Sequence, residues 1–106
     1  MENKTDANSF YTLAIWNVKS GMEKEFINEW AAFAKWINNT ISETGTGYLL
    51  QDMATPLKFI SFGPWSNEQT MQQWGENNEF RNHVIKLIEL CDDFQPNNLK
   101  VVSSSD

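Results

Sequence analysis

The sequence predicts one α+β domain whose strands and helices follow the order βαββαβ, with an antiparallel sheet and both helices on one face. Segments rich in β-branched and aromatic residues predict the strands. Segments with apolar residues at every third or fourth position predict amphipathic helices. A chain of 106 residues suits a single domain. We place it at residues 10–102, between a flexible N-terminal tail at 1–9 and a C-terminal tail at 103–106.

The first half of the chain predicts a strand, a helix and a pair of strands. Phe10–Lys19 is predicted as a strand, and Gly21 after it suits a tight turn. Met22–Ser42 has helical apolar spacing, and two glutamates in its first turn complement the helix dipole. Tyr48–Met53 and Lys58–Trp65 are then predicted as an antiparallel pair of strands.

The second half predicts an interrupted helix and a last strand. Ser66, with Gln69 three residues later, has the pattern of a capping box and predicts a helix start there. Gly75, Asn77 and Asn78 are expected to interrupt this helix. The remaining chain predicts a helix over Glu79–Cys91, with Cys91 on its apolar stripe, a turn over Phe94–Asn98 and a short strand over Leu99–Ser103.

Composition excludes several classes of function. The net charge is −6 and the basic residues are scattered singly, so neither nucleic acid nor an anionic membrane surface is an expected partner. No apolar run is long enough to cross a membrane. The single Cys91 excludes an intrachain disulfide, and the polar start "MENKTDANS" does not resemble a signal peptide. We therefore expect a cytoplasmic protein.

Both faces of the predicted sheet are apolar, although the helices cover only one. On the third strand Phe59 opposes Ile60 and Phe62. On the first strand one face carries Phe10, Ala14, Trp16 and Val18, and the other carries Tyr11, Leu13 and Ile15. A bare apolar face is an aggregation hazard, so we predict a homodimer that packs sheet against sheet. The alternative is a monomer whose loops cover the second face.

Three runs of residues resemble the antibiotic-biosynthesis-monooxygenase domain of the dimeric α/β-barrel superfamily. They are "W.V..G...EF...W" in Trp16–Trp30, "F.SFGPWS" from Phe59, and "W.....F..H...L" from Trp74. The resemblance spans about residues 10–102, and "SFGPWSN" is its most specific part. It implies a ferredoxin-like fold and a sheet-to-sheet dimer, in agreement with the two preceding arguments.

The resemblance leaves three functions open. Some relatives oxygenate polycyclic phenols or quinols with O2 and without a metal or flavin, because the substrate carbanion supplies the electrons. The first hypothesis is therefore that the chain is a cofactor-independent monooxygenase, which holds a small electron-rich aromatic substrate in a pocket between the sheet and the helices. The alternatives are a non-catalytic dimeric barrel that binds a small ligand, and a haem-binding or haem-degrading protein with altered ligation.

Trp74 and His83 are the candidate catalytic residues. Trp74 would stack on the substrate, and its alternative is ordinary helix packing. His83, the only histidine, would remove or hold a phenolic proton, and its alternative is a half-buried residue at the edge of the apolar stripe. Trp65 is expected in the core instead. The residues expected to bind substrate are Trp16, Tyr11, Phe80 and Met71.

The haem-degrading pattern is incomplete. Such relatives place the ligand histidine four residues after the matching phenylalanine, whereas His83 follows Phe80 by three. They also carry an asparagine where this chain has Ala14, and Asn17 lies an odd number of positions away, on the opposite strand face. No cofactor and no metal are therefore expected, and haem is disfavoured.

Overall fold

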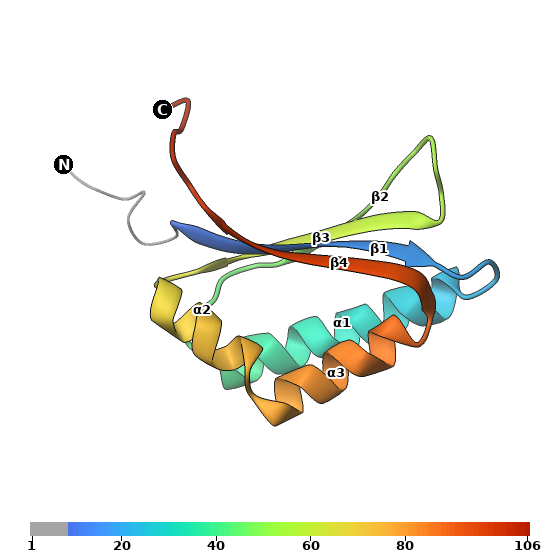
Figure 1. Cartoon of the computed structure of the whole chain (residues 1–106), viewed down its shortest axis with the longest axis horizontal. Coiled ribbons are helices and arrows are strands. Elements are labelled where there is room, and N and C mark those ends of the chain that lie inside the picture. The colour runs from blue at the N-terminus through green and yellow to red at the C-terminus, as the bar shows by residue number, and fades with distance from the viewer. Residues whose placement is uncertain (1–8) are drawn as a thin grey trace.

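The computed structural model describes residues 9–106, so the predicted N-terminal tail lies outside it except for Ser9. Four antiparallel strands form one sheet in the order β2-β3-β1-β4, and three helices cover one of its faces (Figure 1). The elements are β1 (Phe10–Val18), α1 (Glu23–Thr40), β2 (Tyr48–Gln51), β3 (Lys58–Trp65), α2 (Glu68–Gly75), α3 (Asn78–Ile88) and β4 (Cys91–Lys100). The predicted α+β, ferredoxin-like class is confirmed.

Asparagine side chains begin both short helices. Asn67 accepts a hydrogen bond from the Thr70 backbone N–H at 2.8 Å, so the predicted capping box at Ser66 is wrong by one residue. The predicted interruption is confirmed, because α2 ends at Gly75 and Asn77 caps α3 by accepting from the Phe80 N–H at 2.9 Å. The Asn77 cap lies at the bend between α2 and α3, and the Asn67 cap lies where the chain leaves β3 for α2.

The last strand differs most from prediction. β4 begins at Cys91, so the predicted turn over Phe94–Asn98 is wrong and the helix ends before Cys91. The cause is long-range pairing, since β4 pairs with β1 along nearly the whole length of β1. Pro96 is tolerated because β4 is an edge strand, where a missing N–H need not leave a ladder bond unmade.

Successive side chains of the strands point to opposite faces of the sheet, as predicted, and one of these faces lies toward the helices. Trp16, Val18 and Phe59 point inward and join Phe26 and Leu87 in the main core. The opposite face carries Leu13, Ile15, Ile60 and Phe62, together with Tyr48, Leu50 and Leu99, of which the last three are exposed. The second apolar face of the prediction is therefore present. Within residues 9–106, no helix has both the length and the apolarity to cross a bilayer.

Cys91 is buried in the core, although it begins a strand and does not end a helix. Burial raises the pKa of its thiol from 9.0 to about 11. The neighbouring Asp92 carboxylate also raises this pKa, and the Lys19 ammonium lowers it by a smaller amount. The folded protein therefore holds the thiol proton more tightly than the unfolded chain does.

We expect the free energy of unfolding to fall as pH rises from 9 to 11, because the unfolded thiol loses its proton first. Below pH 9 the thiol is protonated in both the folded and the unfolded state, so there it causes no change of the free energy of unfolding with pH. Urea unfolding of the wild type and of Cys91→Ala measures the effect. A fall of equal size in Cys91→Ala would contradict the assignment to this thiol.

Candidate functional site

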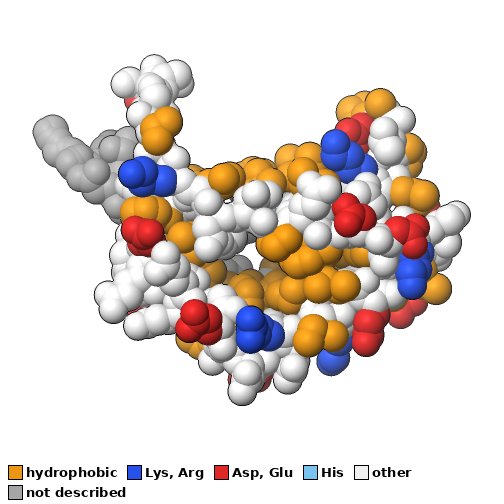
Figure 2. Space-filling model, in the orientation of Figure 1, with side chains coloured by type: hydrophobic (Ala, Val, Ile, Leu, Met, Phe, Trp, Pro, Cys, Tyr) orange, Lys and Arg blue, Asp and Glu red, His pale blue; other side chains and the backbone are white. Residues whose placement is uncertain are grey.

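A cavity of about 750 Å³ lies between the inner face of the sheet and the helices. Figure 2 shows apolar side chains around a hollow between β4 and α3. Its volume falls in the range of small-molecule sites, and such sites are mostly apolar with a few placed polar groups. The lining of this cavity matches that description.

Small residues of the two central strands form the floor. Ala14 of β1 lies opposite Ser61 of β3, and Thr12 lies opposite Gly63. Residues directly opposite each other in an antiparallel pair point to the same face, so all four face the helices. Because their side chains are short, space remains above the sheet where larger residues would fill it.

Two buried indoles stand at the ends of this floor, and each donates a hydrogen bond to a floor hydroxyl. Trp16 Nε1 donates to Ser61 Oγ at 2.9 Å, and Trp65 Nε1 donates to Thr12 Oγ1 at 3.1 Å. Both tryptophans are 3% exposed. The bonds satisfy the indole N–H groups and fix both rings against the floor. Trp65 thus belongs to the core, as expected, and also lines the cavity.

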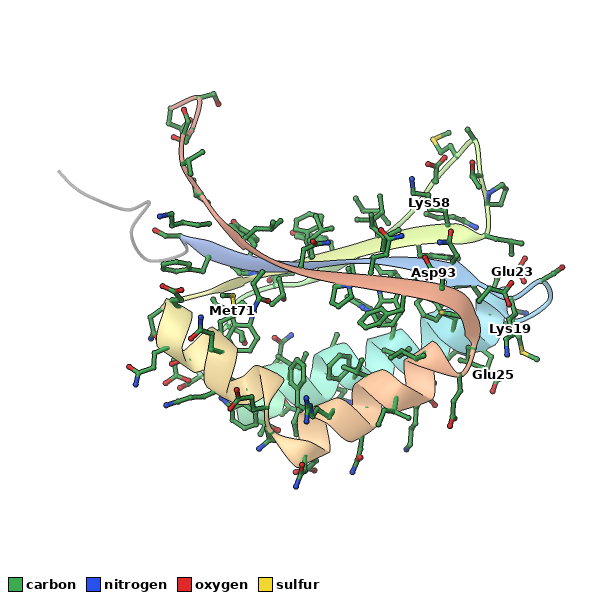
Figure 3. The ribbon with its side chains drawn as sticks, viewed as in Figure 1. Lys19, Glu23, Glu25, Lys58, Met71 and Asp93 are labelled. Atoms are coloured by element: carbon green, nitrogen blue, oxygen red, sulfur yellow. The ribbon has the colours of Figure 1, made fainter. Side chains whose placement is uncertain are left out.

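The helices supply an aromatic roof. Trp30 and Phe33 of α1, with Phe80 and Val84 of α3, line this side of the cavity. The rings of Phe33 and Phe80 meet edge to face, with centroids 5.1 Å apart. Met71 of α2 closes one end, between the helix and the sheet (Figure 3).

Polar side chains surround the mouth. Gln72 and Arg81 reach it from the helices, Glu76 from the link between α2 and α3, and Asn98 from β4; all four are exposed. Of the lining residues within 9–106, only Glu76 and Arg81 are ionisable. The charged groups therefore lie at the entrance, and the interior offers rings, aliphatic groups and hydroxyls.

The structure brings three of the six predicted site residues to the cavity. Trp16, Phe80 and Met71 line it, whereas His83, Trp74 and Tyr11 are not among the lining residues in the described part of the chain.

His83 lies in the contact between α1 and α3. Its half-buried ring is stacked on Phe33, with centroids 5.3 Å apart and planes 18° apart, and it lies 4.7 Å from the Trp36 ring. This is the border position that the prediction held as the alternative.

Trp74 also packs on Trp36, with ring centroids 6.0 Å apart. One residue further along α2 the backbone has turned by about 100°, so Gly75 lines the cavity and Trp74 does not.

Tyr11 points to the other side of the sheet. There it lines a smaller hollow of about 270 Å³, with Phe62 at 6.4 Å between ring centroids.

Sequence reasoning missed the two floor hydroxyls. A signal for them exists, because Thr12 alternates in step with Ala14 and Trp16, and Ser61 alternates in step with Phe59. A polar residue on an otherwise apolar inward strand face is the informative exception.

The residues present do not fit haem. The only histidine is held between rings outside the cavity, and Ala14 stands on the floor where haem-degrading relatives are expected to have an asparagine. Within residues 9–106, no group of three or more His, Cys, Asp or Glu side chains is placed to hold a metal ion.

Comparisons with known proteins reveal likeness in structure alone. No protein-family model matches the chain, and no curated protein matches it. A variant of SnoaB, described as a cofactor-independent oxygenase from Streptomyces nogalater, superimposes with a TM-score of 0.82 over 93% of this chain and 98% of that chain, at 14% identity.

Two further solved structures have the same fold. A conserved protein from Methanosarcina mazei Go1 gives a TM-score of 0.77 at 16% identity, over 91% of this chain and 95% of its own. A structure described as an antibiotic biosynthesis monooxygenase gives 0.73 at 12% identity, over 89% of this chain and 99% of its own. At these identities the likeness establishes the fold and leaves the chemistry to be argued from the cavity.

Proposed function

We propose that the chain is a cofactor-independent monooxygenase for a flat, electron-rich aromatic such as a hydroquinone or an anthrone. The observation that carries the proposal is the 750 Å³ cavity, with its aromatic roof and its floor of small side chains and two hydroxyls. The description of SnoaB as a cofactor-independent oxygenase supports it, because SnoaB has the same fold over almost its whole length.

The reaction requires no redox group from the protein. In an anthrone, a CH2 between two rings loses a proton to give a resonance-stabilised carbanion, which donates electrons to O2. The carbon bonds to O2, and the peroxide anion takes up a proton from water to give a hydroperoxide. The hydroperoxide loses water, so one oxygen atom becomes the ring carbonyl and the other leaves as H2O. The protein binds the substrate flat and excludes bulk water.

The lining residues supply this environment. Trp16 and Phe80 offer ring surfaces to a planar substrate, and Met71 fills the closed end. In the proposal His83 and Trp74 act through packing, since both contact Trp36 and hold the three helices together. The proton released by the substrate passes to water at the polar mouth.

We further propose a homodimer that packs the outer sheet faces together. The connection between β2 and β3 and the segment after β4 both rise above this face, at its two ends (Figure 1). The face between them carries the apolar residues that no helix covers. Its partner is a second copy of the same face, as in an isologous dimer.

Ala14→Leu is expected to lower oxygen consumption with hydroquinones and anthrones at least about tenfold, because the larger side chain occupies the floor where the substrate would lie. Ala32→Leu, the same change at an exposed position of α1, is the matched control and should keep wild-type rates. An oxygen electrode measures both, and thermal unfolding confirms that both variants are folded.

Two results would count against the proposal. Unchanged uptake in Ala14→Leu would place the reaction outside this cavity. Binding of these aromatics to the wild type, without oxygen uptake, would favour the alternative of a non-catalytic binding protein.

A further inference from the structure

The two floor hydroxyls each have an unused donor. A hydroxyl can donate one hydrogen bond and accept two. Ser61 Oγ and Thr12 Oγ1 each accept from an indole N–H, at 2.9 and 3.1 Å. Within residues 9–106, neither hydroxyl donates its own proton to a protein acceptor.

Such donors need partners from the cavity. Ser61 is only 8% exposed and lines the cavity, as Thr12 does. A buried donor without an acceptor costs free energy, so the ligand or a water molecule must accept from it. Each hydroxyl already accepts from an indole, which polarises its O–H bond and strengthens the bond that it donates.

The strand register sets the spacing between the donors. Ser61 lies opposite Ala14 and Thr12 lies opposite Gly63, so the two hydroxyl residues are diagonal neighbours on one face, about 7–8 Å apart. Ala14 and Gly63 occupy the other diagonal, and because both residues are so small, neither projects far into the cavity between the two donors. This arrangement leaves open surface between the two hydroxyls, which a planar ring system with an oxygen atom at each edge would match.

We propose that Ser61 and Thr12 form a two-point donor site for a planar ligand with two acceptor oxygens on opposite edges, namely a quinone or the deprotonated form of its quinol. The inference rests on the proposed substrate class and narrows it, because a single phenolic oxygen would satisfy only one hydroxyl. It also assigns a role in the reaction. Donors at both oxygens stabilise negative charge in the deprotonated quinol. The ring carbon beside one oxygen then bonds to O2, the peroxide takes up a proton, and loss of water leaves the hydroxyquinone, so a quinol needs no CH2 group.

Binding of para-naphthoquinone and of naphthalene, measured by calorimetry, tests the site without turnover. We expect Ser61→Ala and Thr12→Val each to weaken naphthoquinone binding about tenfold, and to leave naphthalene binding unchanged, because one hydrogen bond is lost. Thr12→Ser keeps the hydroxyl and should bind both ligands like the wild type. Ser61→Ala also leaves the Trp16 N–H without its acceptor, and Thr12→Val does the same to the Trp65 N–H, so near-ultraviolet circular dichroism checks that both rings stay in place.

Equal weakening for both ligands would show that the hydroxyls only shape the cavity, and would overturn the proposal. Failure of the wild type to prefer naphthoquinone over naphthalene would do the same. The two proposals fail separately. Quinone binding that depends on the hydroxyls, without oxygen uptake, would support this site and refute the monooxygenase proposal. Oxygen uptake together with binding that does not depend on the hydroxyls would support the monooxygenase proposal and refute this site.

Discussion

Ile60→Asp is expected to convert the proposed homodimer into monomers. Ile60 lies on β3 at the centre of the outer face, directly opposite Ile15 of β1 and Leu50 of β2. In a face-to-face dimer the new carboxylate would be buried among apolar side chains of the partner. Burying an unpaired charge costs several kcal/mol, and the symmetry of the dimer introduces the change twice.

The exposures of the outer face support a strong effect. Tyr48, Leu50 and Leu99 are 53%, 48% and 43% exposed, and the rings of Tyr48 and Phe62 lie 5.6 Å apart beneath that open surface. At one end Lys58 and Asp93 flank Asn17 across three strands (Figure 3), so the apolar area is bounded by charge. Apolar area with a polar border is the usual composition of a protein interface.

Sedimentation equilibrium measures the change. A penalty of about 4 kcal/mol corresponds to a dissociation constant raised about a thousandfold. Ile27→Asp is the matched control, because Ile27 is 43% exposed on α1, far from the outer face, and should leave the dimer intact. A wild type that sediments as a monomer at micromolar concentration would contradict the dimer itself.

The pattern of the sequence determined the type of most elements but not the course of the last strand. In α1 and α3, apolar spacing is local information, and the structure follows it to within two or three residues. β4 contains a proline and two asparagines, which favour turns locally. Its strand conformation comes from pairing with β1, and that partner lies more than seventy positions earlier in the sequence.

The site was predictable only in part, for the same reason. Trp16, Phe80 and Met71 could be selected as inward-facing residues. The bond from Trp16 to Ser61 joins residues 45 positions apart, so it depends on strand register, which the pattern alone does not define. The pattern left His83 between a cavity position and a border position, because the packing of α3 on α1 decides which rings it contacts.

Phe26→Ala is expected to lower the free energy of unfolding by about 3–5 kcal/mol, the range found when a fully buried phenylalanine is truncated. Phe26 is 0% exposed, and its ring centroid lies 5.4 Å from that of Trp16 and 5.3 Å from that of Phe59. Truncation opens a void beside both rings. Because Trp16 also lines the cavity and bonds to Ser61, the void should loosen the site as well as the core.

Phe94→Ala, compared with Phe26→Ala, tests whether burial in the core or contact with Trp16 determines how much a phenylalanine ring contributes to stability. The Phe94 ring lies even closer to Trp16, at 4.4 Å between centroids, but it is only half-buried, on the edge strand β4. We expect a loss of about 1–2 kcal/mol, because less apolar surface returns to water and the neighbours can relax toward solvent. Urea unfolding at one fixed protein concentration compares the two variants, since dimerisation makes the apparent stability depend on concentration. Equal losses would mean that contact with Trp16, and not depth in the core, determines the contribution of each ring.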